Sequence, residues 1–134
     1  MKNIAITENH LYQKAYKNGK RFVGKTVAVY VLRDYAAGRL RKANPQKELV
    51  NRLGLSVSKK IGGAVERNRA KRIIRAAYDE LRPTLKRGFL IVISARGAIN
   101  GKSSTDVERE LSVAFTKLEL RIPDESAPAS TQNT

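Results

Sequence analysis

The feature that most constrains this chain is a strongly cationic stretch that also has the periodicity of a helix. Five of the nine residues from Arg67 to Arg75 are Lys or Arg. At about 100° per residue, the apolar residues near this stretch fall on one side of an α-helix and the cations on the other. The apolar side consists of Ala70, Ile73, Ile74, Ala77 and Leu81. The sequence therefore predicts a helix over about residues 64–82 that packs on a core with one face and presents cations with the other.

The charge of this helix indicates a nucleic-acid partner. Solvated helices usually mix both signs, but no acid occurs between Glu66 and Asp79. Arginine forks match phosphate oxygens bidentately, and lysine adds a point charge. Asn68 has no charge and either hydrogen-bonds RNA or orders the start of the helix. The candidate RNA-binding residues are Lys59, Lys60, Arg67, Asn68, Arg69, Lys71, Arg72 and Arg75.

The distribution of charge over the whole chain supports this interpretation. The 134 residues have a net charge of +15. Residues 1–75 hold 19 Lys and Arg against 4 acids, whereas residues 76–134 hold 8 of each. A basic footprint on part of a domain is typical of nucleic-acid binding, and an anionic membrane surface is the rival partner. Because the apolar side of the basic helix offers mainly Ala and Ile for a core, we expect no membrane partner.

Composition places further limits on the class of protein. There is no cysteine, which excludes disulfides, thiolate zinc sites and thiol catalysis. The longest clean apolar run, Phe89 to Ile93, is far too short to span a bilayer, and no signal peptide is apparent. We expect a soluble cytoplasmic protein with one domain over residues 1–121. Residues 122–134 are rich in Ser, Ala, Pro and Thr and predict a disordered tail.

Periodicity and breakers predict a single small α+β domain in which a central sheet is packed by helices. The order is α-β-β-α-β-α, with a β-α-β crossover through the basic helix and the option of a further strand within residues 20–33. A capping box from Thr105 to Glu108 opens the last helix. The elements are a helix capped by Thr7 and running to Asn18, strands over residues 22–33, 51–58 and 89–94, the basic helix, and a loop over residues 34–48 that carries Arg39, Arg41 and Lys42.

A second candidate site combines small residues with tyrosines. Gly54, Ser56 and Ser58 alternate along one face of the strand over residues 51–58, where another backbone can approach closely. Tyrosine rings stack single-stranded bases at roughly 1–3 kcal/mol per base. Tyrosines at helical spacing are more often part of a core, so both interpretations stay open on spacing alone. The candidate cleft residues are Tyr12, Tyr16, Tyr30, Gly54, Ser56 and Ser58.

No set of residues in the sequence forms a recognisable catalytic site. His10 is the sole histidine, and the sequence shows no acid or nucleophile motif around it. The acids Asp106, Glu108 and Glu110 lie in the first turns of a predicted helix, where the helix dipole favours negative charge. We therefore predict no catalytic and no metal-binding residues in the protein, which is better suited to positioning RNA than to cutting it.

The string from Leu55 to Gly62, followed by Ala64-Val65, Arg67-Asn68-Arg69, Lys71-Arg72 and Arg75, resembles the signature of the bacterial ribonuclease P protein component. The tyrosine-bearing first helix, the strand around Tyr30, the Ala95-Arg96 pair and the final helix follow in the same order as in that family. The resemblance covers most of the chain. The loop near residues 36–48, which looks longer than the family minimum, and the tail after Ile122 depart from it.

The resemblance implies the protein subunit of an RNA-based endonuclease. In this family a large catalytic RNA with bound magnesium cuts the 5′ leader from precursor tRNA, and the protein helps to bind the RNA and the leader. It also implies that the candidate cleft takes the leader and that the β-α-β crossover is left-handed, although nearly all such crossovers are right-handed. The alternative function is that of a ribosomal or other structural RNA-binding protein, which needs the basic helix but no leader cleft.

Overall fold

The computed structural model describes residues 4–6, 9–36, 39, 42 and 51–122. Residues 64–81 form the basic helix, one residue shorter than predicted. The elements in chain order are β1 (Ile4–Ala5), α1 (Asn9–Asn18), β2 (Lys20–Val23), β3 (Val27–Arg33), β4 (Arg52–Ser56), the 3-10 turn η1 (Lys59–Ile61), α3 (Ala64–Leu81), η2 (Arg82–Thr84), β5 (Phe89–Ala95), η3 (Gly97–Ile99) and α4 (Ser104–Lys117).

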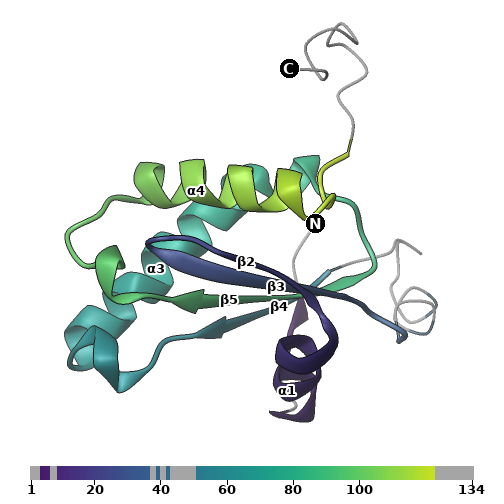
Figure 1. The fold of residues 1–134 in the computed structure, drawn as a ribbon, viewed down its shortest axis with the longest axis horizontal. Coiled ribbons are helices and arrows are strands. Elements are labelled where there is room, and N and C mark those ends of the chain that lie inside the picture. Colours follow the sequence, from purple (N-terminus) through teal and green to yellow (C-terminus); the bar gives the residue numbers. More distant parts are fainter. Residues whose placement is uncertain (1–3, 7–8, 37–38, 40–41, 43–50, 123–134) are drawn as a thin grey trace, which may run out of the picture.

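The strands form one mixed sheet in the order β1-β4-β5-β3-β2. β4 and β5 are parallel and are joined through α3, so the predicted β-α-β crossover is present. β3 pairs antiparallel with both β5 and β2. Helix α1 lies on one face of the sheet, and α3 and α4 lie on the other (Figure 1). The predicted α+β class is therefore confirmed.

The face of the sheet under α3 and α4 holds the larger core. Val27, Val29 and Val31 of β3 contribute to it, with Ile91 and Ile93 of β5 beside them. The predicted apolar stripes of both helices pack on these residues. The helix residues buried in this core are Ala70, Ile74, Ala77, Tyr78 and Leu81 from α3, and Val107, Leu111, Ala114 and Phe115 from α4.

The opposite face holds a smaller core beneath α1. Leu11 and Ala15 of α1 pack with Ile6, Leu90 and Val92. Around this cluster lie half-buried side chains: Tyr12, Tyr16, Tyr30 and Leu32. Since α1 has only ten residues, it covers part of this face.

Residues 20–33 form two strands, which corrects the prediction of one long strand and bears out the option of a further one. The break is a turn at Gly24, held by a side chain from α4. The backbone N–H groups of Thr26 and Val27 both donate to Glu110 Oε1, at 2.9 and 3.0 Å. The Glu110 carboxylate also occupies the space that a Cβ at Gly24 would need. This bracing by a residue more than 80 positions away is invisible in the local sequence.

Other predicted boundaries also change. The capping box of α4 uses Ser103 and Asp106, two residues earlier than predicted: Ser103 Oγ accepts from the Asp106 N–H, and the Asp106 carboxylate accepts from the Ser103 N–H. β4 ends at Ser56, and β1 was not predicted. The described domain runs to Ile122, whose N–H donates to the Thr84 carbonyl. Thr7, most of the loop over residues 34–48 and the predicted tail from residue 123 on lie outside the described residues.

Candidate RNA interface

The turn between β4 and α3 sets the start of the cationic helix. Ser58 Oγ accepts from the Lys60 N–H at 3.3 Å, which caps η1 and leaves Lys59 and Lys60 exposed. Gly62 has a φ of +144°, a conformation that residues with a Cβ rarely adopt. At the first turn of α3, the Glu66 carboxylate accepts from the N–H of Gly63 at 2.8 Å. Local hydrogen bonds thus fix where the cations begin.

The cationic face of α3, which we define as Arg67, Arg69, Lys71, Arg72 and Arg75, points away from the core. Arg72 and Arg75 are exposed, as is the neighbouring Asn68. Arg67, Arg69 and Lys71 are half-buried. The Arg69 guanidinium donates to the Lys102 carbonyl at 2.7 Å and ties α3 to the segment before α4. The predicted segregation of apolar and cationic residues on this helix is therefore confirmed.

The small residues of β4 meet the first tyrosine of α1. A Cβ built on Gly54 would lie 2.7 Å from the Tyr12 ring and hydroxyl, so Tyr12 packs directly on this glycine. Burial raises the pKa of the Tyr12 phenol, and the adjacent Tyr16 raises it further, while a hydrogen bond with the Leu55 backbone opposes the shift. Tyr12 therefore remains a neutral phenol at physiological pH. The absence of a side chain at Gly54 therefore allows Tyr12 of α1 to pack closely on β4, and Gly54 does not form an open base of the cleft.

A cleft of about 580 Å³ lies between α1 and the end of β4. We call it the tyrosine cleft. Of the six predicted cleft residues, Tyr12, Tyr16 and Ser56 line it. Tyr30 supports it from the sheet, with its ring 4.8 Å from that of Tyr16 in an edge-to-face arrangement. Ser58 belongs to the η1 turn. The lining residues are Ile6, Asn9, Tyr12, Gln13, Tyr16, Leu55 and Ser56.

A second cavity connects the tyrosine cleft with the cationic face. It has a volume of about 300 Å³ and shares Ile6, Tyr12 and Leu55 with the cleft. From α3 it receives Lys71 and Arg75. Leu53 and Asp79 complete its lining. The two predicted sites, which are separate in sequence, therefore lie on one continuous surface around the edge of the sheet, where β4 continues past the two-residue strand β1.

Asn9 and Gln13 were not predicted as cleft residues. They stand at positions i and i+4 on α1, and Tyr16 follows at i+7, so all three share one flank of the helix. This spacing was readable in the sequence. Ile6 enters the lining because its N–H donates to the Leu53 carbonyl and so continues the pairing of β1 with β4, a long-range contact that no local pattern announces.

The carboxylates at the start of α4 have structural partners. Hydrogen bonds with Ser103 lower the pKa of the Asp106 carboxyl below its ordinary value, and Glu110 braces the β2–β3 turn. Within the described residues, no group of three His, Cys, Asp or Glu side chains is placed to hold a metal ion. Nor does the described part of the chain contain a helix long and apolar enough to cross a bilayer.

Fold and site together define a class of small basic proteins in which a mixed sheet carries a cationic crossover helix on one face and a short tyrosine-bearing helix on the other. The chain belongs to the ribonuclease P protein family, whose sequence profile, described as Ribonuclease P, matches residues 1–119. This family acts in tRNA processing, and membership implies an RNA partner within a ribonucleoprotein.

Similar proteins and solved structures agree with this assignment. The ribonuclease P protein component of Clostridium acetobutylicum is 37% identical over 125 residues, which cover 93% of this chain and 97% of the relative. That of Oceanobacillus iheyensis is 34% identical over 83% of each chain. The Staphylococcus aureus RNase P protein superposes with a TM-score of 0.71 at 25% identity, over 90% of this chain and all of that one. The Thermotoga maritima protein, at 20% identity, has the same fold with a TM-score of 0.63 over 84% of this chain and 94% of its own.

Proposed function

We propose that this protein binds the catalytic RNA of ribonuclease P through the cationic face of α3 and the 5′ leader of precursor tRNA through the tyrosine cleft. The RNA, with its bound magnesium, performs the hydrolysis that matures the tRNA 5′ end. The observation that carries the proposal is the division of α3 into a buried apolar stripe and a cationic face over residues 67–75, with no acid between Glu66 and Asp79.

The cationic face suits a phosphate backbone. Arg72 and Arg75 are exposed and one turn apart, so both can reach phosphates of the same strand or groove. Lys59 and Lys60 extend the charge beyond the start of the helix. Contacts of this kind position an RNA without reading its sequence. That suits a subunit that must hold one structured RNA in place.

The tyrosine cleft suits a single strand. Its volume of about 580 Å³ exceeds that of a nucleobase, and Tyr16 presents a half-buried ring on its wall. Stacking on aromatic rings is tolerant of sequence, as the leaders of different precursor tRNAs require. The shared cavity at Tyr12 and Leu55 gives a strand that leaves the cationic face a path into the cleft. Membership of the ribonuclease P family favours this function over that of a ribosomal or other structural RNA-binding protein.

The proposal is tested by reconstitution. The purified protein alone should leave precursor tRNA uncut, and addition of the cognate catalytic RNA should give cleavage at low magnesium. The catalytic RNA alone at the same magnesium concentration is the control, and it should be much slower. Cleavage by the protein alone that persists after rigorous removal of contaminating nucleases would overturn the proposal, as would an absence of any effect of the protein on the RNA.

A further inference from the structure

Tyr35 differs from every other tyrosine of the chain. All five tyrosines lie within the described residues. Tyr78 is fully buried, and Tyr12, Tyr16 and Tyr30 are half-buried. Tyr35, by contrast, has 78% of its surface exposed, the largest value among the exposed large hydrophobic residues of the described part. Neither of the two sites above accounts for it.

A cation accompanies the exposed ring. The ammonium of Lys14 on α1 lies 5.3 Å from the centroid of the Tyr35 ring, within the range of a cation–π contact. At about 100° per residue, Lys14 stands about 100–160° around the α1 axis from Asn9, Gln13 and Tyr16. The Tyr35–Lys14 pair therefore lies on the flank of α1 that faces away from the tyrosine cleft.

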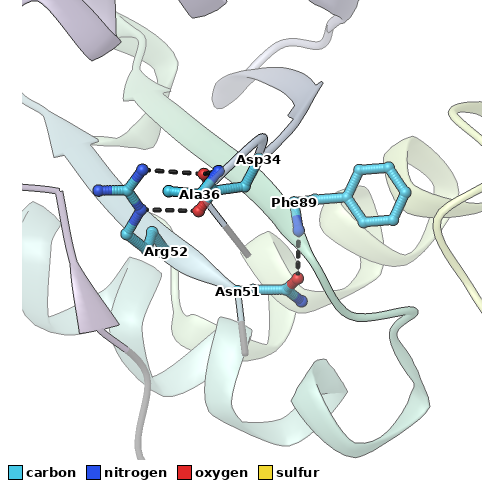
Figure 2. Close-up of polar contacts among 5 residues, drawn as sticks. All are labelled: Asp34, Ala36, Asn51, Arg52 and Phe89. Carbon is cyan, nitrogen blue, oxygen red and sulfur yellow. Dashed lines mark hydrogen bonds and ion pairs between the residues drawn. The ribbon is translucent and has the colours of Figure 1, made fainter. Parts of the chain in front are cut away.

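The turn that carries Tyr35 is held by a buried ion pair. Asp34, only 3% exposed, accepts from Arg52 Nε at 2.7 Å and from the other end of the guanidinium fork at 2.9 Å (Figure 2). The same carboxylate accepts from the Ala36 N–H at 3.0 Å. The Asp34 N–H in turn donates to the Gly88 carbonyl at 2.9 Å. Hydrogen bonds thus hold both neighbours of Tyr35, and together these residues form a support for the ring.

Arg52 also connects this support to the central sheet. Arg52 begins β4 and pairs with Leu90 of β5. The preceding Asn51 accepts from the Phe89 N–H at 2.9 Å (Figure 2). Its side-chain amide also donates to the Lys86 carbonyl at 2.9 Å. Buried ion pairs add little net stability compared with apolar packing but cost several kcal/mol to break. The Asp34–Arg52 ion pair holds the turn that carries an exposed aromatic ring. Its presence has an explanation if the position of the Tyr35 ring is important for binding.

The Tyr35 turn and the start of α3 lie at opposite ends of the sheet. Tyr35 follows the end of β3, beside the start of β4, whereas η1 and the first turn of α3 follow the end of β4. Figure 1 shows these two ends on opposite sides of the view. The five residues of β4 alone separate them by about 13 Å. The RNA contact that we propose for the cationic face of α3 therefore does not include Tyr35.

We propose that the Tyr35–Lys14 pair, which we call the Tyr35 platform, binds an unpaired base of the RNA, with the ring stacking on the base and the Lys14 ammonium pairing with an adjacent phosphate. The inference rests on the proposed RNA-binding function and adds a third contact to it. The base belongs either to the catalytic RNA or to the tRNA, and both sources offer the same chemistry. Asp34 and Arg52 act as positioning residues for the platform.

The test compares Tyr35→Ala with Tyr35→Phe in the full-length protein. One arm measures affinity for the cognate catalytic RNA, and the other measures affinity of the assembled holoenzyme for precursor tRNA. Tyr35→Ala should weaken one of the two by about 5- to 150-fold, the range for removal of one base–aromatic stack. Tyr35→Phe keeps the ring and should stay close to wild type. The arm that changes identifies the source of the base.

A matched variant separates this inference from the proposed function. Arg72→Ala removes a cation from α3 and should weaken binding of the catalytic RNA, with a shallower salt dependence, whereas Tyr35→Ala should leave the salt dependence unchanged because it removes no charge. If Arg72→Ala has its effect and Tyr35→Ala has none in either arm, the platform is overturned and the proposed function stands. Equal losses for Tyr35→Phe and Tyr35→Ala, or a lowered thermal midpoint for Tyr35→Ala, would also overturn it.

Discussion

The two faces of the sheet use apolar and polar residues in different ways. The face under α3 and α4 is closed by aliphatic and aromatic side chains such as Ile74, Tyr78 and Phe115, all with no exposed surface. The face under α1 has a smaller cluster, half-buried tyrosines, a cleft and a buried ion pair at its edge. One face supplies the stability of the fold, and this leaves the other free to remain partly open.

Tyrosine occurs on both faces and shows the difference directly. Tyr78 and Phe115 meet edge to face at 6.1 Å inside the large core, and burial raises the pKa of Tyr78 to about 12. Tyr16 and Tyr30 meet in a similar geometry at 4.8 Å, but both keep part of their surface accessible. The same residue type and the same ring geometry thus serve a closed core in one place and the wall of a cleft in the other.

The largest expected effect comes from truncating these two tyrosines in turn. Tyr78→Ala should lower the free energy of unfolding by about 3–5 kcal/mol, as for other large aromatic residues removed from a core. Tyr16→Ala should cost less than half as much, because its ring is only half-buried. Denaturant unfolding measures both, and Tyr78→Phe is the control that keeps the ring. Equal losses for the two alanine variants would mean that the tyrosine cleft is part of the core.

The second prediction concerns the ion pair at the edge of the α1 face. Asp34→Asn leaves the Arg52 guanidinium buried beside a neutral partner and should cost about 3 kcal/mol of unfolding free energy. Burial raises the pKa of Asp34, but hydrogen bonds from Arg52 and from the Ala36 N–H, with the Arg52 charge, outweigh burial and hold it below its ordinary value.

The lowered pKa of Asp34 fixes the direction of the pH dependence. The carboxylate contributes stability at pH values above its unfolded pKa of about 3.9, and this contribution is lost as the pH falls through the lower folded pKa. The difference in unfolding free energy between wild type and Asp34→Asn should therefore be constant near neutrality and shrink below about pH 4. A difference that grows on acidification would contradict the ionised pair.

The third prediction concerns the cationic face and involves no change in stability. Arg72 and Arg75 are exposed, so their joint replacement by Ala should leave the thermal midpoint nearly unchanged. Each phosphate that the variant no longer neutralises should reduce the slope of log K against log salt by about 0.7–0.9. Titration of the catalytic RNA at several salt concentrations measures this slope. An unchanged slope would mean that both side chains face solvent in the complex.

Arg69 is a poorer probe of the cationic face, although the sequence suggested it equally. Its guanidinium already donates to the Lys102 carbonyl, so Arg69→Ala removes a hydrogen bond between α3 and the segment before α4. A drop in both RNA affinity and thermal midpoint is expected for Arg69→Ala. A drop in affinity alone would show that the hydrogen bond to Lys102 adds little to stability.

The sequence predicted α3 almost to the residue because its signals are local. The apolar positions recur with helical spacing, Gly62 and Gly63 precede the helix, and Pro83 follows it. The same holds for β5, because its apolar run is too short for a typical helix and therefore predicts a buried strand. For α4, however, two capping-box patterns overlap, Ser103 with Asp106 and Thr105 with Glu108. The earlier pair caps the helix.

The cleft was only partly predictable because its shape depends on distant contacts. The missing side chain at Gly54 predicted open space beside the strand, but the Tyr12 side chain of α1 occupies that space. The β2–β3 turn depends on Glu110, and the Tyr35 turn depends on Arg52, which lies 18 positions beyond Asp34. Residue types and periodicity identified the tyrosines and Ser56, whereas the packing of α1 against β4 decided which of them line the cleft.

The central claim is that the two surfaces bind different RNAs, and the most direct test is the ratio of precursor to mature tRNA affinity of the assembled holoenzyme. Tyr16→Ala should lower this ratio by about 5- to 150-fold because only precursor tRNA has a leader to stack. Ser56→Phe, which fills the cleft, should do the same. Arg72→Ala, at a residue that lines neither the cleft nor the adjoining cavity, should leave the ratio unchanged while weakening assembly. Equal weakening of precursor and mature tRNA by Tyr16→Ala would contradict the account.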